Sequence, residues 1–137
     1  MGSTAEEILY ELITSDAQIN TQIAGRMYPG ILPQGNDVPA IIYNRISTDR
    51  LKIMQGPAAY SDARIQLDIY SESYKTTKIL ANRVRHLLDY YDGRVGGTEL
   101  KAVFIEGEGH SVEEDAETEQ RLYRATLDLS VIHDEEL

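Results

Sequence analysis

Apolar and polar residues alternate in several stretches of the chain, and this two-residue period is typical of β-strands with one buried face. The alternation is cleanest between Ala63 and Ser71, and it continues without interruption between Leu122 and His133. The stretch that begins at Ala40 is rich in β-branched and aromatic residues, which also favour strands. The pattern therefore predicts four strands, over residues 40–47, 63–71, 100–106 and 122–133.

Apolar residues recur at helical spacing in two other parts of the chain. The first part, residues 3–13, begins with Ser-Thr-Ala-Glu, the pattern of a helix capping box. The second has an apolar stripe between Thr77 and Tyr91 and ends at Gly93. Residues 16–24 repeat the capping pattern on a smaller scale, and they form either a short helix or a turn before Gly25.

The main predicted elements follow one another in the order α-β-β-α-β-β. Because each pair of strands is expected to form a hairpin, the predicted fold is an α+β domain. It has a four-stranded, mainly antiparallel sheet with two helices on one face, which is a permuted ferredoxin-like order. In this fold, strands 63–71 and 122–133 are adjacent at the sheet centre, and Pro39 marks strand 40–47 as an edge. The uncovered, half-polar face suits contact with a neighbouring subunit.

Two long connections lie between the strands. The first, residues 48–62, is longer than a usual hairpin loop and has a Gly-Pro pair in its middle. Its apolar residues Leu51, Ile53 and Met54 have no evident core to bury them. The segment therefore marks a partner site, folds back over the sheet, or is shortened by extension of the strands. The second connection, residues 106–119, is strongly acidic and contains glycines, which predicts a solvated acidic loop.

The segment between Gly25 and Pro39 is dense in turn residues, because proline presets φ and glycine supplies positive φ. Considered alone, it is an ordinary connector. Together with the following strand, however, it resembles the tail completion family of long-tailed bacteriophages. The resemblance covers nearly the whole chain. The residues that show it are 25–30, 33–35, 39, 43–47, 63–70 and 122–129.

Members of this family are small head-to-tail joining or tail terminator proteins. The resemblance implies a structural subunit without a catalytic step. Such subunits assemble as a ring, commonly a hexamer, at the head-proximal end of the tail. The implied partners are other copies of the chain, the tail tube protein and the head-tail connector proteins. The implied location is the virion, after assembly in the host cytoplasm. The resemblance does not separate a terminator from a joining protein.

Length and charge agree with such a role. A chain of 137 residues predicts a single domain spanning residues 1–137. The net charge of −10 argues against binding to nucleic acid, which needs clustered Lys and Arg, and suits a ring through which DNA passes. No apolar run approaches the roughly 20 residues of a membrane span, and no secretory signal is visible. The absence of cysteine fits a reducing cytoplasm.

Residue types that commonly serve catalysis or metal binding are not arranged in a known pattern. The three histidines are scattered along the chain. His110 lies among acidic residues whose oxygens could bind a hard cation weakly, but the spacing of a calcium loop is absent. No nucleophile elbow, phosphate-binding loop or dinucleotide fingerprint is present in the sequence. We therefore expect no enzyme, no bound metal and no cofactor.

The expected functional parts are surfaces. One lies in the 48–62 loop, and another is a basic face on the second helix. Because a closed ring joins two different surfaces, we expect the basic face to meet the acidic 106–119 stretch of the next subunit. The alternative function is a small ferredoxin-like ligand-binding or regulatory domain, which would need a pocket with convergent polar groups. The candidate contact residues are Arg50, Leu51, Ile53, Met54, Lys75, Lys78, Arg83 and Arg85.

Overall fold

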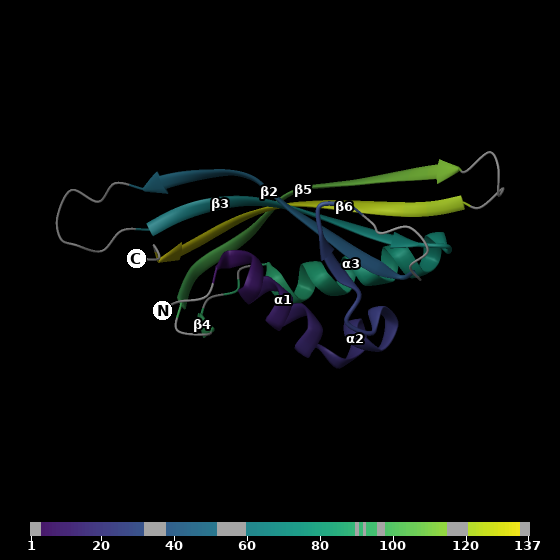
Figure 1. Cartoon of the computed structure of the whole chain (residues 1–137), viewed down its shortest axis with the longest axis horizontal. Coiled ribbons are helices and arrows are strands. Elements are labelled where there is room, and N and C mark those ends of the chain that lie inside the picture. The colour runs from purple at the N-terminus through teal and green to yellow at the C-terminus, as the bar shows by residue number, and fades with distance from the viewer. Residues whose placement is uncertain are drawn as a thin grey trace.

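A computed structural model describes residues 4–31, 38–51, 60–89, 91, 93–95, 98–114 and 121–134. Within these residues the chain forms three helices and six strands, with the helices on one side of the sheet (Figure 1). No helix in this part of the chain is long and apolar enough to cross a membrane. In chain order the elements are α1 (Ala5–Ser15), α2 (Ala17–Ile23), β1 (Met27–Pro29), β2 (Ala40–Leu51), β3 (Tyr60–Ser71), α3 (Tyr74–Leu88), β4 (Gly93–Val95), β5 (Thr98–Glu114) and β6 (Arg121–Asp134).

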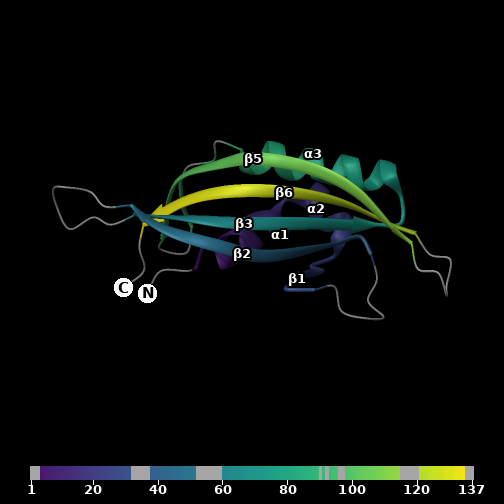
Figure 2. The ribbon, with the colours of Figure 1, turned by 90° about the horizontal axis from the view of Figure 1, so that it is seen from above.

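The strands form one sheet in the order β1-β2-β3-β6-β5-β4, with β3 and β6 at its centre (Figure 2). Neighbouring strands are antiparallel, except that β1 runs parallel to β2. The alternating pattern predicted that residues 63–71 and 122–133 would be central neighbours. The register of β3 with β6, in which Ile65 lies opposite Leu129, confirms this prediction.

The predicted fold class is wrong in the number and order of its elements. The described residues form a six-stranded mixed sheet with three helices, not a four-stranded, mainly antiparallel sheet with two helices. The pattern missed β1 and β4 because a three-residue strand is too short to show an alternation, and β1 also lies among turn residues. Since Met27 of β1 pairs with Ile41, β2 is not the edge strand along this part of its length.

Strands β2 and β3 extend into the segment that was predicted to be a long hairpin loop. β2 continues to Leu51 and β3 begins at Tyr60, and these two residues lie opposite each other in the ladder. Extension of the strands was one of the three possibilities for residues 48–62. Residues 52–59 lie outside the described part of the chain.

The acidic stretch is also a strand over most of its length. β5 continues to Glu114, so the prediction of a solvated loop over residues 106–119 is wrong for residues 106–114. Residues 115–119 lie outside the described part of the chain. The ladder with β6 tolerates the negative charge because arginines lie nearby on the partner strand. Arg124 Nη1 is 3.1 Å from Glu113 Oε1, and Arg121 Nε is 3.7 Å from Glu114 Oε1.

The core lies between the helices and the one sheet face that they cover (Figures 1 and 2). α1 begins after Thr4, whose side chain accepts a hydrogen bond from the backbone N–H of Glu7 at 3.1 Å, so the cap is Thr4 rather than Ser3. Each large apolar side chain that is fully buried stabilises the fold by about 1.5–3 kcal/mol. Those with the largest volumes are Ile8, Leu9, Ile13, Ile19, Ile23, Ile41, Ile42, Ile65, Leu67, Ile69, Leu80 and Leu88.

Asp16 caps the short helix α2 and forms an ion pair with α3. Its Oδ1 accepts hydrogen bonds from the backbone N–H groups of Gln18 and Ile19, at 3.0 and 3.2 Å, and so caps α2. Its Oδ2 lies 2.9 Å from Arg83 Nη2 on α3. Burial raises the pKa of Asp16, but the bonds from Arg83 and the two amides outweigh burial, and the pKa lies below its usual value. The charged carboxylate therefore stabilises the contact between the two helices.

Replacing Asp16 with Asn should lower the free energy of unfolding at neutral pH by about 1 kcal/mol, because Asn keeps a capping oxygen but loses the charge that Arg83 binds. The folded-state pKa of Asp16 is lowered from 3.8, so its contribution is present above pH 3.8 and is lost as the pH falls through the folded-state value. Urea unfolding of both proteins from neutral pH down to about pH 2 measures the difference.

The control is Glu11→Gln, which removes the same charge from an exposed position on α1. If the Asp16→Asn variant still has a lower free energy of unfolding than the unchanged protein at the lowest pH, the loss comes from the geometry of the cap and not from the ion pair.

Candidate functional site

The histidine and acidic side chains of the described residues do not form a metal-binding cluster. No group of three or more His, Asp and Glu residues in this part of the chain could hold a metal ion. The histidines lie on three different elements: His86 on α3, His110 on β5 and His133 on β6. His110 Nε2 is 3.9 Å from Glu108 Oε1, and His133 is buried.

The basic side chains of α3, predicted to form one contact face, have different surroundings. Arg83 binds Asp16 of α2, as described above. Lys78 Nζ lies 5.9 Å from the centroid of the Tyr74 ring, within range of a cation–π interaction. Arg85 is half-buried, whereas Lys75 is exposed. Lys75 and Lys78 are therefore the basic groups of α3 with the fewest ties to the rest of the subunit.

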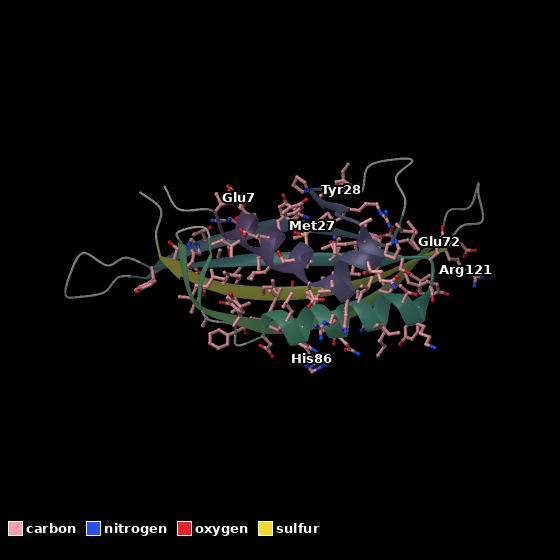
Figure 3. The ribbon with its side chains drawn as sticks, turned by 90° about the horizontal axis from the view of Figure 1, so that it is seen from below. Glu7, Met27, Tyr28, Glu72, His86 and Arg121 are labelled. Carbon is pink, nitrogen blue, oxygen red and sulfur yellow. The ribbon has the colours of Figure 1, made fainter. Side chains whose placement is uncertain are left out.

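The acidic strand β5 lies beside α3 and not on a distant surface (Figure 3). Near the end of α3, Asp89 Oδ1 accepts a hydrogen bond from the backbone N–H of Ile105 at 3.3 Å. At the other end of the helix, the Tyr74 ring is 6.4 Å from the ring of His110 on β5. The basic and acidic segments thus share one side of the subunit. They do not supply the two separate surfaces that a head-to-tail contact requires.

An aromatic cluster that the sequence pattern did not reveal lies at the first turn of α3. The rings of Tyr74 and Tyr123 are 6.0 Å apart in a T-shaped arrangement, and His110 completes the cluster. Val112 lies opposite Tyr123 in the β5–β6 ladder and is exposed. The members come from α3, β5 and β6, so only the tertiary register brings them together. Exposed aromatic and aliphatic groups of this kind are typical of protein contact sites.

A groove of about 310 Å³ runs between α2 and α3. Ile79 and Leu80 supply its apolar part, and amide, hydroxyl and basic side chains supply the rest. The groove is open to solvent along the outside of the helical layer, and His86 lies on the outer side of α3 (Figure 3). Its lining residues are Gln18, Gln22, Thr76, Ile79, Leu80, Arg83 and His86.

The uncovered face of the sheet is polar, and its side chains are paired with one another. Thr126 Oγ1 donates to Asp68 Oδ1 at 2.6 Å, which satisfies a carboxylate that is largely buried. Arg124 Nε donates to Ser111 Oγ at 3.0 Å. A hydrogen bond to the Tyr70 hydroxyl raises the pKa of Arg124 above its usual value. This face is therefore a stable, hydrated surface.

Two β-bulges shape a hollow in the uncovered face. The register shifts between Arg45 and Ser47 on β2, and between Ile105 and Gly107 on β5, at the same level of the sheet. Each bulge inserts one extra residue and bends its strand. The hollow has a volume of about 250 Å³, and its lining residues are Ile46, Arg64, Ile65, Glu106, Asp128 and Leu129.

The other predicted contact residues lie at the far end of β2. Arg50 and Leu51 are the last two residues of the strand and lie opposite Ser61 and Tyr60. Ile53 and Met54 lie outside the described residues. The two candidate contact regions, the end of the β2–β3 hairpin and the basic residues of α3, are therefore on different parts of the subunit.

Comparison with known proteins identifies the family. The model of a family described as tail completion protein gp17 matches residues 7–134. No curated protein sequence matches the chain significantly. Among solved structures, a chain in the virion of a native gene transfer agent particle has the same fold, with a TM-score of 0.71. The two chains are 14% identical, and the alignment covers 96% of this chain and 95% of the other.

At that identity the solved structure supports the fold alone, whereas the family match concerns the sequence itself. The match begins within α1 and ends at the last residue of β6, so it includes every strand and the whole of α3. The chain therefore belongs to the tail completion protein gp17 family and has a structural role in a phage tail.

Proposed function

We propose that this protein forms a ring at the head-proximal end of a phage or phage-like tail, where it completes the tail and joins it to the head. The observation that carries the proposal is the family match over residues 7–134. The fold shared with a chain of a gene transfer agent virion supports a place in a particle of this kind. The proposed ring is a hexamer that forms in the host cytoplasm, and its role includes no catalytic step.

The charge of the molecule supports this position. A tail passes DNA to the host, so a protein that surrounds the path of DNA must not bind phosphate groups. With a net charge of −10, the subunit repels phosphate instead of attracting it. The proposed partners are therefore proteins: other copies of the chain, the tail tube protein and the head-tail connector proteins.

We assign the contacts with the tube and connector proteins to two regions. The first is the end of the β2–β3 hairpin, which extends beyond the layer of helices (Figure 1). The sequence that follows β2 contains the apolar residues Ile53 and Met54, and apolar groups that remain exposed tend to mark partner sites. The second is α3, whose Lys75 and Lys78 remain at the surface. The assigned residues are Arg50, Leu51, Ile53, Met54, Lys75, Lys78, Arg83 and Arg85.

Particles assembled without this protein test the proposed role directly. If the protein joins the tail to the head, electron microscopy should show filled heads beside separate tails of normal length. If it terminates the tail, the tails should be abnormally long. Expression of the protein from a plasmid should restore complete particles and is the control. Normal, complete particles in its absence would contradict both forms of the proposal.

A double replacement, Ile53→Ser and Met54→Ser, tests the hairpin contact. Incorporation into tails should fall by tenfold or more, because burying each apolar side chain against a partner stabilises the complex by about 1.5 kcal/mol. The unfolding midpoint in urea should not change, because the assignment places these residues in a partner contact and not in the core. Incorporation is measured by quantitative blotting of purified tails. A large decrease in stability would show that the segment belongs to the core, and the assignment would fail.

Charge reversal at Lys75 and Lys78 tests the α3 contact. The double variant Lys75→Glu, Lys78→Glu should reduce incorporation more strongly at low salt than near 1 M salt, where the Debye length falls to about 3 Å. The effect of each exposed pair should be about 0–1 kcal/mol, so the reversal changes the choice of partner more than the total affinity.

Thr21→Glu is the matched control for this reversal, because it adds negative charge to an exposed position on α2. Arg83→Glu should differ from both variants, because it also breaks the ion pair with Asp16 and should lower stability. Equal incorporation of the lysine reversal and the unchanged protein at every salt concentration would remove α3 from the contact.

A further inference from the structure

Most of the large hydrophobic side chains that remain exposed lie on two opposite sides of the subunit. Within the described residues, six such side chains have exposed fractions between 41% and 81%. Three belong to α1, the end of β1 and β2, and two belong to the side where α3 lies beside β5, whereas Ile79 of α3 lies in the groove between α2 and α3. Surface groups of this kind tend to mark partner sites. The first edge holds Tyr10, Ile31 and Ile46, and the second edge holds Tyr74 and Val112.

Both edges have exposed apolar side chains in the helical layer and in the sheet layer. In the helical layer, Tyr10 of α1 is on the first edge, and Tyr74 of α3 is on the second. In the sheet layer, Ile46 of β2 is on the first edge and Val112 of β5 is on the second. Figure 3 shows the same division, with Glu7 and Tyr28 along one long side of the molecule and His86 along the other. Each edge thus offers apolar groups in both layers.

Each edge also contains strand backbone without a neighbouring strand in the described part of the chain. β1 pairs with β2 only over residues 41–43, which leaves residues 44–51 without a strand on their outer side. β4 pairs with β5 only over residues 98–100, and the N–H of Ile105 is covered by Asp89. Residues 106–114 of β5 have no strand on their outer side within the described residues. Such edges are templates for pairing with another chain.

The direction of the strands favours head-to-tail continuation of the sheet. β2, β3, β6 and β5 are antiparallel in succession, so β5 runs opposite to β2. A second copy placed in the same orientation would therefore set its β2 antiparallel to β5 of the first copy. An antiparallel ladder is the slightly more stable of the two pairings. No reversal of the subunit is needed, which is the condition for a heterologous contact that closes into a ring.

The charges of the two free stretches are opposite in sign, although Arg45 already binds Glu6 of α1, and Glu113 and Glu114 already face arginines of β6. Residues 44–51 of β2 contain two arginines and one aspartate. Residues 106–114 of β5 contain four glutamates and neither lysine nor arginine. Opposite charges on facing strands stabilise a ladder, whereas two acidic edges would repel each other. A pairing of unlike edges is therefore favoured over a pairing of two β5 edges.

We propose that the β2 edge of one subunit docks on the β5 edge of the next copy of this chain, in an antiparallel ladder flanked by the exposed apolar groups. This inference rests on the proposed ring and names its interface. In the subunit, Asn44 of β2 is level with Gly107 of β5, so the free stretches lie at opposite ends of the sheet. Neighbouring subunits are therefore shifted along the strands by about seven residues, roughly 24 Å, and the strands are inclined as in a barrel.

Two variants, each defective at one edge, test the arrangement. Ile46→Glu disrupts the β2 edge and Val112→Glu disrupts the β5 edge, and both side chains are exposed, so the fold should survive. Alone, each variant should self-associate about tenfold or more weakly than the unchanged protein. Mixed together, they retain one intact pair of edges and should form dimers but nothing larger. Sedimentation velocity measures these species, and Thr21→Glu, which adds the same charge at an exposed position on α2, is the control that should assemble normally.

Cross-linking in purified tails tests the same contact where the ring would act. The chain contains no cysteine, so Ile46→Cys and Val112→Cys can be introduced singly or together. A bis-maleimide should convert the double variant into a ladder of oligomers, and each single variant should remain monomeric. Cross-linking in tails also tests the interface if the isolated protein does not associate in solution.

Several outcomes would overturn the inference. Dimers from one single-cysteine variant would indicate a symmetric contact, and a block by Thr21→Glu would show that added charge, not the loss of an edge, prevents assembly. The absence of a ladder in tails that contain the double variant would also reject it. If the ladder is absent but particles without the protein are still defective, the proposed function stands and only the interface is wrong. If the ladder of oligomers forms but particles made without the protein are normal, the interface stands and the proposed function is wrong.

Discussion

The antiparallel pairing of β3 with β6 is the interaction on which the rest of the structure depends. These two strands occupy the centre of the sheet, and each presents an unbroken row of buried apolar residues to the helices. Ile65, Leu67 and Ile69 of β3 lie opposite Leu129, Leu127 and Ala125 of β6. Because a slip of one residue would turn both rows to the uncovered face, the register of this pair is strongly specified. α1, α2 and α3 pack on the surface that the two rows form.

A sheet covered on one face imposes a second requirement, which is that the other face must be stable in water. The side chains there form pairs such as Thr126 with Asp68 and Ser130 with Asp62, so that partly buried carboxylates keep hydrogen-bond partners. The bulges at Ile46 and Glu106 bend the two outer long strands at the same level. The polar groups of the uncovered face are consequently satisfied by one another, and exposed apolar groups such as Tyr10 and Val112 lie towards the edges of the subunit.

The residues that stabilise the subunit are mostly different from those proposed to contact its neighbours. The helices and the central strands account for the stability of the subunit, as the buried core and the Asp16–Arg83 pair illustrate. Residues 44–51 of β2 and 106–114 of β5 do not belong to the buried core, and within the described part of the chain they have no strand on their outer side and carry exposed side chains such as Ile46 and Val112. A structural protein of a phage tail acts through contacts with its neighbours, so the proposed function depends on features that the isolated subunit leaves incomplete.

The amino-acid sequence by itself determined the elements whose periodicity is long. The alternation over residues 63–71 and 122–133 located β3 and β6 and their central position, and helical spacing located α1 and α3. The sequence also indicated the family, because the turn residues around Pro29 and Pro39 and the strands behind them occur in a characteristic order. These features are local, or they repeat over so many residues that the pattern does not depend on any single position.

Only the tertiary structure decided the remaining features, because each depends on residues that are distant in the chain. β1 is a strand because Ile41 lies beside it, and β5 continues through its glutamates because Arg121 and Arg124 lie on the adjacent strand. The basic face of α3 is divided because Arg83 reaches Asp16, which lies 67 positions earlier in the chain. A helical projection shows which residues share a side of α3, but the neighbour that each residue meets is set by the packing of other elements against the helix.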